Sequence, residues 1–139
     1  MYGFHSVAEA IANPKRKKLE LWVTKNARNK LISKVNLPKI PTHYIEKTSK
    51  LPISREAVHQ GVILKVAPLN HQLDNKFRTR EGKSIVIVLD KVTDPQNVGT
   101  IIRTSLFFGC IAVINSERGG AREGGALAKG ASGALEKIP

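Results

Sequence analysis

The stretch of residues 83–110 constrains the fold more than any other part of the sequence. It opens with five consecutive apolar residues at positions 85–89, four of which are β-branched. Such a run is typical of a strand that is buried on both faces inside a parallel sheet. A polar loop follows, and from Val98 onward the apolar residues recur at helical spacing, which predicts a helix after the strand.

Both ends of this helix are marked in the sequence. Asp94 precedes Pro95, which fits an N-cap followed by proline at the first helical position. Gly109 closes the pattern as a C-terminal cap, and the apolar residues 111–114 predict a second strand. The polar loop then lies at the carboxyl end of the first strand, where ligands bind in open α/β sheets.

Length and composition exclude several classes of protein. The 139 residues fit one ordinary domain or two small ones, and no apolar run approaches the roughly 20 residues that span a bilayer. The N-terminus lacks the early positive charge of a signal peptide. The single cysteine, Cys110, excludes an internal disulfide and favours a reduced, cytoplasmic setting.

The positive charge of the chain is concentrated in its first part. Residues 1–82 hold 16 Lys and Arg against 6 Asp and Glu, a net charge of +10. Residues 83–139 hold 7 against 5, a net charge of +2. This asymmetry favours a nucleic-acid-binding module joined to a nearly neutral one, although a solvated basic surface, or a surface that binds membranes, would give the same excess.

Helical and strand patterns alternate along the first part of the chain, which predicts a small α/β domain at residues 1–67. The patterns predict helices at 4–12, 27–35 and 51–58 and strands at 19–23, 43–45 and 61–66. Residues 68–82 are polar and charged, which is typical of a linker, so a second domain is expected at 83–139. That domain has a further helical pattern at 126–135.

A basic run, Lys15, Arg16, Lys17 and Lys18, lies in the connection between the first predicted helix and the first predicted strand. These side chains are candidate contacts to RNA phosphates. A solvated loop explains the same run equally well.

Few residue patterns in the chain point to a known catalytic chemistry. The four histidines have no metal-ligand spacing, so no metal is expected, and the common nucleotide-binding and nucleophile motifs are missing. What remains is a polar set on the predicted helix after the first strand. Gln96, Gly99 and Arg103 share one helical face there, and the missing side chain of Gly99 leaves room for a ligand near the guanidinium. Asn97 lies in the first turn.

The same residues have a structural interpretation. Arg103 could pair with Asp90 or Asp94, and Asn97 could be a turn residue that bonds its own backbone. The pattern alone does not separate this interpretation from a catalytic one.

The segment LDKVTDPQNVGTIIRTSLFFGC resembles the first motif of the SpoU (TrmH-type) RNA 2'-O-ribose methyltransferases of the SPOUT class. The residues that match are Asp94-Pro95, Asn97, Gly99, Arg103 and Thr104. YGFHSVAEAI and HQGV resemble parts of the family's substrate-binding domain, and GALAKGASGALEKIP resembles the segment that leads out of the second helix of its methyltransferase domain. The matches keep their order over nearly all of the chain.

The resemblance implies a fold and a function. We expect a small α/β/α RNA-binding domain, followed by a Rossmann-like parallel sheet that ends in a trefoil knot. The implied activity is methyl transfer from S-adenosylmethionine to a ribose 2'-hydroxyl, with a guanosine of 23S ribosomal RNA as the expected target and tRNA as another possible one. Arg103 matches the residue proposed to activate the hydroxyl, and Asn97 matches the motif asparagine. A homodimer is also implied.

The sequence departs from the family in one respect. Members carry a second motif with a glycine-rich loop and a glutamate, and a third SLNVS-like motif, and neither occurs in these 139 residues. Because those segments supply most of the S-adenosylmethionine pocket and thread the knot, we expect an incomplete sheet and a chain inactive by itself. The cofactor-binding residues therefore stay unknown. A non-catalytic RNA-binding remnant is the alternative hypothesis.

Overall fold

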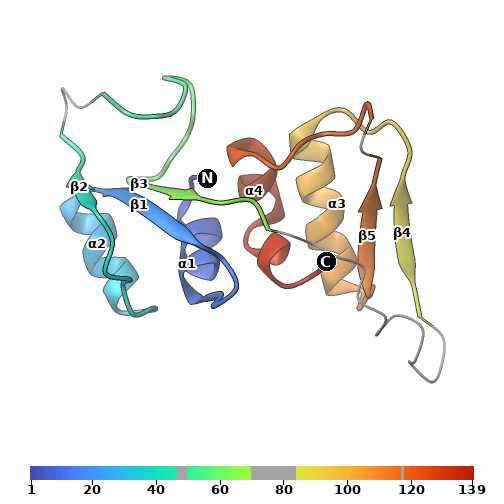
Figure 1. Ribbon diagram of the computed structural model, residues 1–139, viewed down its shortest axis with the longest axis horizontal. Coiled ribbons are helices and arrows are strands. Elements are labelled where there is room, and N and C mark those ends of the chain that lie inside the picture. Colours follow the sequence, from blue (N-terminus) through green and yellow to red (C-terminus); the bar gives the residue numbers. More distant parts are fainter. Residues whose placement is uncertain (47–49, 70–83, 117) are drawn as a thin grey trace.

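The computed structural model describes residues 1–46, 50–69, 84–116 and 118–139. The chain forms two small sheets, one of three strands and one of two, and each sheet has its own cluster of buried side chains. Figure 1 shows the two units side by side, with helices packed between the sheets. The predicted α/β class is confirmed.

The N-terminal unit is built around β1 (Lys18–Val23). β2 (Thr42–Tyr44) pairs with it in parallel on one side, and β3 (Val62–Val66) pairs with it antiparallel on the other. Helices α1 (Phe4–Ala12) and α2 (Lys25–Ile32) share one apolar core with the sheet. All five elements lie at or close to their predicted positions.

Local contacts fix the turns of this unit. The Thr24 side chain caps α2 by accepting a hydrogen bond from Ala27 N at 3.2 Å. Gly61, just before β3, has a φ of 77°, and a Cβ there would lie 2.6 Å from Thr24 Oγ1. Only glycine therefore fits at this position of the predicted HQGV segment.

The helix predicted at residues 51–58 is wrong. The structure has turns there, in which Ser54 Oγ accepts a hydrogen bond from Glu56 N and Ser54 O accepts one from Ala57 N. A serine that bonds nearby backbone groups competes with helix formation. The linker predicted at 68–82 lies almost wholly outside the described residues.

The C-terminal unit contains β4 (Val86–Leu89) and β5 (Ala112–Asn115), which pair in parallel as predicted. Helix α3 (Pro95–Phe107) connects the two strands. Helix α4 (Gly125–Ala131) and the short 3-10 helix η2 (Ala134–Glu136) follow β5 and join the same core. Pro139 O accepts a hydrogen bond of 2.9 Å from Val113 N, so the last described residue lies beside β5.

The predicted caps of α3 are confirmed. Asp94 Oδ1 accepts a hydrogen bond from Gln96 N at 2.9 Å, Pro95 opens the helix, and Gly109 follows its end with a φ of 72°. The helix predicted at 126–135 is interrupted, because Ser132 and Gly133 both adopt positive φ angles. α4 therefore ends at Ala131, and η2 forms separately.

The expectation that the first strand of this unit is buried on both faces is wrong for the described chain. Val88 is 69% exposed, and Ile85 and Val86 are also exposed. Figure 1 shows the reason, since α3 and α4 lie on the same side of β4 and β5. Nothing in the described ranges packs on the other face.

Among the described residues, no helix has both the length and the apolar content to cross a membrane.

Candidate functional site

The predicted site residues lie on α3, directly after the carboxyl end of β4. Asn97 is in the first turn and Arg103 is six residues further, and both are exposed. Six residues of an ideal helix correspond to about 9 Å along the axis and about 120° around it. The helix therefore does not direct the two side chains to a single point.

The Arg103 guanidinium has no hydrogen bond or ion pair to any described residue. In particular it does not pair with Asp90 or Asp94, the structural interpretation that the sequence left open. Asp94 is engaged instead in capping α3. A permanently charged donor that has no partner in the described ranges is available there to an anionic or hydroxyl-bearing ligand.

Gly99 has a different role from the predicted one. It is buried where α3 crosses α4, and a Cβ there would lie 2.8 Å from Ala131 N and would collide with Leu127 O. At Gly130, on the facing helix, a Cβ would lie 3.4 Å from Gly99 Cα. Gly99 thus lets two helix backbones meet, and the prediction that it leaves room for a ligand is wrong.

Arg16 is also corrected, since it is 1% exposed and cannot reach a phosphate on the surface. Its guanidinium donates to Glu136 at 2.6 Å, to Glu123 at 2.6 Å and to Ala67 O at 2.9 Å. Burial by itself lowers the pKa of Arg16, but the hydrogen bonds to Glu136 and Glu123 outweigh burial and raise it above its ordinary value. Arg16 therefore joins the two units.

Unlike Arg16, the three lysines of the basic run are not buried. Lys15 and Lys17 are exposed, whereas Lys18 is half-buried and its Nζ donates to Asn13 O at 2.5 Å. Of the four basic residues, Lys15 and Lys17 are thus the exposed ones, and their contact with RNA stays a prediction.

More contacts join the two units along α1. Ser6 Oγ donates to Ala128 O of α4 at 2.7 Å, and Asn13 Nδ2 donates to Glu136 at 2.7 Å. Lys137 Nζ lies 3.1 Å from a carboxylate oxygen of Glu9. The predicted RNA-binding part thus packs directly against the part that carries Arg103.

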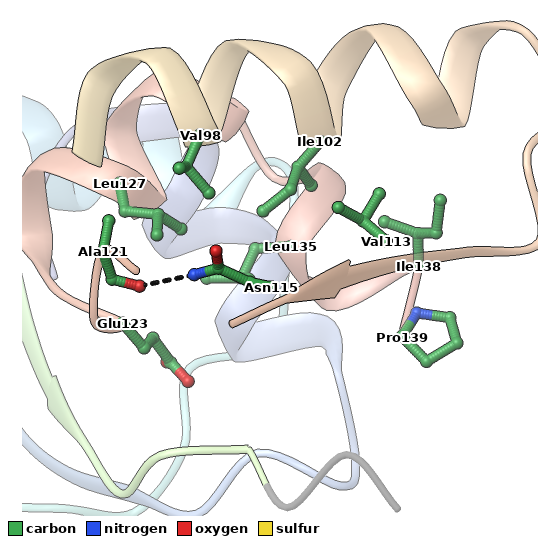
Figure 2. A pocket seen from close by; sticks show the side chains of 10 residues that line it. All are labelled: Val98, Ile102, Val113, Asn115, Ala121, Glu123, Leu127, Leu135, Ile138 and Pro139. Carbon is green, nitrogen blue, oxygen red and sulfur yellow. Dashed lines mark hydrogen bonds between the residues drawn. The ribbon is translucent and has the colours of Figure 1, made fainter. Parts of the chain in front are cut away.

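A cavity of about 150 Å³ lies at the carboxyl end of β5, beneath α3 and α4 (Figure 2). Asn115 Nδ2 donates to Ala121 O at 2.8 Å, and Asn115 Oδ1 is buried without a hydrogen-bond partner among the described residues. The lining is mostly apolar and consists of Val98, Ile102, Val113, Asn115, Ala121, Glu123, Leu127, Leu135, Ile138 and Pro139. Arg103 and Asn97 do not line it.

Two family models match the chain in the order that the sequence suggests. Residues 1–72 match the RNA 2'-O ribose methyltransferase substrate-binding domain, and residues 84–139 match the SpoU rRNA methylase family. The first match alone covers more than half of the chain. This chain belongs to the SpoU family of RNA methyltransferases.

Similar proteins agree with this assignment. A TrmH family tRNA/rRNA methyltransferase of Staphylococcus aureus is 33% identical to this chain. The matching region covers 99% of this chain and 58% of the relative. The 23S rRNA (guanosine-2'-O-)-methyltransferase RlmB of Haemophilus ducreyi is 29% identical over 100% of the chain and 59% of its own length. The chain thus spans less than two thirds of the length of these relatives.

Solved structures of other SpoU-type proteins share the fold. The AdoMet-bound rRNA methyltransferase of Sinorhizobium meliloti has a TM-score of 0.70 at 22% identity, with 100% of this chain and 51% of that one covered. AviRb of Streptomyces viridochromogenes, in complex with AdoMet, has a TM-score of 0.67 at 19% identity, with 100% and 52% covered. The two-unit arrangement therefore corresponds to about half of each of these chains.

S-adenosylmethionine does not fit the cavity of Figure 2. Pockets for ligands of that size have volumes of roughly 300–1,000 Å³, and this cavity has about 150 Å³. Its lining also offers one unpartnered acceptor, Asn115 Oδ1, and otherwise mainly apolar atoms. The residues that hold the methyl donor are therefore not assigned. No group of three or more His, Cys, Asp or Glu side chains suited to a metal occurs in the described part of the SpoU chain.

One feature of the N-terminal unit has no signature in the sequence. Trp22 of β1 and His43 of β2 form a stacked pair, with ring centroids 5.2 Å apart. The alternation of β1, with Leu21 and Val23 buried, already directs Trp22 away from the core. Pairing with His43 depends on the strand register, which the sequence does not reveal.

Proposed function

We propose that this chain provides the RNA-binding domain, residues 1–67, and the first part of the catalytic domain, residues 83–139, of an RNA 2'-O-ribose methyltransferase. The methyl group would come from S-adenosylmethionine, which two structural relatives contain according to their names. The observation that carries the proposal is Arg103, which is exposed and has no partner among the described residues, on the first helix of the segment that matches the methylase family.

Arg103 has the chemistry to prepare a ribose hydroxyl for attack. A guanidinium carries five N–H donors and no acceptor, and it stays protonated at any physiological pH. It would donate to the 2'-oxygen and stabilise the negative charge that develops there, while water or a phosphate takes the proton. Asn97 would support this geometry from the first turn of α3 through its own amide.

The proposed substrate is ribosomal RNA, with a guanosine of 23S rRNA as the target and tRNA as the alternative. The name of the Haemophilus relative supports this choice, and the net charge of +10 on residues 1–82 supports a polyanionic partner. Lys15 and Lys17 are the proposed phosphate contacts. We further propose a cytoplasmic homodimer, supported by the free Cys110 and by the exposed apolar side of β4.

Methyl transfer tests the proposed role of Arg103. The protein from the complete reading frame that contains these residues is incubated with labelled S-adenosylmethionine and unmodified ribosomal RNA. We expect label on a ribose 2'-oxygen, and we expect Arg103→Ala to lower the rate by about 100-fold or more, since loss of one donor to a developing oxyanion has that effect.

The matched control is Arg122→Ala, which removes another exposed arginine of the same unit. It should retain the full rate. Activity of Arg103→Ala equal to that of Arg122→Ala would show that Arg103 does not act on the hydroxyl.

A non-catalytic RNA-binding protein is the second candidate, and the small volume of the cavity favours it for the 139 residues alone. Calorimetric titration of this chain with S-adenosylmethionine separates the candidates. Micromolar binding would exclude the non-catalytic reading. RNA binding without cofactor binding, together with an inactive complete protein, would support it.

A further inference from the structure

The outer face of the three-stranded sheet carries two stacked aromatic rings. Leu21 and Val23 of β1 are buried in the N-terminal core, so Trp22 between them points to the opposite face. Trp22 is in register with His43 of the parallel strand β2. The two rings are 5.2 Å apart between centroids and inclined by 25°. The register between β1 and β2 therefore brings the Trp22 and His43 rings together.

The stack ends in solvent at His43. β2 is an edge strand in which every residue is exposed, and the His43 side chain is 50% exposed. On the other side, Trp22 is in register with Ile63 of β3, which is 2% exposed. A further flat ring can thus be added to the stack only on the His43 side.

An ion pair between β1 and β3 lies next to the stacked rings. Lys65 Nζ lies 2.7 Å from Glu20 Oε1, and Glu20 Oε2 lies 3.6 Å from His43 Nε2. The hydrogen bond from Lys65 holds the pKa of Glu20 below its ordinary value, so this carboxylate remains ionised beside the imidazole. Lys65 is itself 57% exposed, and it keeps donors free for a second partner.

We propose that the Trp22–His43 pair is a stacking platform for an unpaired base of single-stranded RNA. The inference rests on the proposed function, in which RNA is the substrate, and adds the place where a base is held. Unpaired bases stack on aromatic side chains in sequence-tolerant recognition, while nearby basic groups contact the backbone. The net positive charge of the first part of the chain, +10 over residues 1–82, supplies the basic groups for such backbone contacts.

The single tryptophan of the chain makes the test direct, since Trp22 is the only source of tryptophan fluorescence. The 139-residue chain is titrated with a fluorescently labelled single-stranded oligouridine, and both the label anisotropy and Trp22 emission are followed. We expect quenching of Trp22 that parallels binding. A blunt RNA duplex, whose bases are already stacked, should bind without that quenching.

Three variants identify the contribution of the ring. His43→Ala should weaken oligouridine binding by roughly 5-fold or more, the range expected for loss of one base–aromatic contact. His43→Phe should restore it, because stacking needs a flat ring rather than an imidazole. Tyr44→Ala, which removes an exposed neighbour from the other face of β2, should have no effect. Thermal unfolding followed by circular dichroism verifies that each variant is folded.

Failure of the stacking platform can be distinguished from failure of the proposed function. Oligouridine binding that leaves Trp22 emission unchanged and is equal in all three variants would overturn the platform and leave the proposed function intact. Failure of the chain to bind either RNA at low salt would contradict its role in RNA binding as well.

Discussion

At the scale of single residues, Arg16 joins the two units through a buried ion-pair network. Its guanidinium is fully buried, and the Glu136 side chain that it contacts is 2% exposed. We predict that Arg16→Met lowers the free energy of unfolding by about 3–5 kcal/mol, because it leaves a buried carboxylate without its partner. Urea unfolding followed by circular dichroism measures the change.

The control for this prediction is Arg55→Met, which replaces an exposed arginine of the same unit and should change stability by less than about 0.5 kcal/mol. The double variant Arg16→Met, Glu136→Gln should recover part of the loss, since the unpaired charge is removed. Equal stability of Arg16→Met and Arg55→Met would show that the network contributes little.

The sequence predicted individual residues well where the cause was local. Asp94, Pro95 and Gly109 act at the ends of α3 as expected, because a cap depends on neighbours within a few positions. The predictions for Arg16 and Gly99 are wrong, because the residues that they contact, Glu136 and Ala131, are far away in the chain. No pattern in the KRKK run distinguishes the one buried cation from the other three.

At the scale of elements, the crossing of α3 and α4 depends on Gly99. We predict that Gly99→Ala destabilises the protein by about 1–3 kcal/mol, because the added methyl group forces two close-packed backbones apart. Gly124→Ala is the matched control, since a Cβ there would meet only Arg122 O at 3.8 Å. Chemical unfolding measures the stability of both variants. Equal stability would show that the helix crossing does not depend on glycine at position 99.

The periodicity of the apolar residues predicted the helices and strands. It did not predict whether the second face of a strand is buried. The run at 85–89 correctly predicted β4, but a sequence pattern reports how apolar a strand is and not what covers it. In the described chain the sheet has two strands with helices on one side, so Val88 and its register partner Ile114 remain exposed. The apolar run therefore indicates an interface that these residues do not complete.

At the scale of the whole molecule, this exposed apolar surface is expected to drive self-association. On the uncovered face of the sheet it consists of Val86, Val88 and Ile114. Contiguous apolar surface and an open strand edge favour contact with another copy. We predict a sedimentation coefficient that rises with protein concentration for the unmodified chain, and a smaller rise for Val88→Lys.

The comparison that decides this prediction is Val58→Lys. Val58 is 62% exposed, close to the 69% of Val88, but it belongs to the turns of the N-terminal unit. The same charge introduced there should leave association unchanged. If both substitutions reduced association equally, net charge rather than the surface around β4 would be responsible. A concentration-independent sedimentation coefficient of the unmodified chain would contradict both explanations, and the proposed homodimer would then need an interface outside these elements.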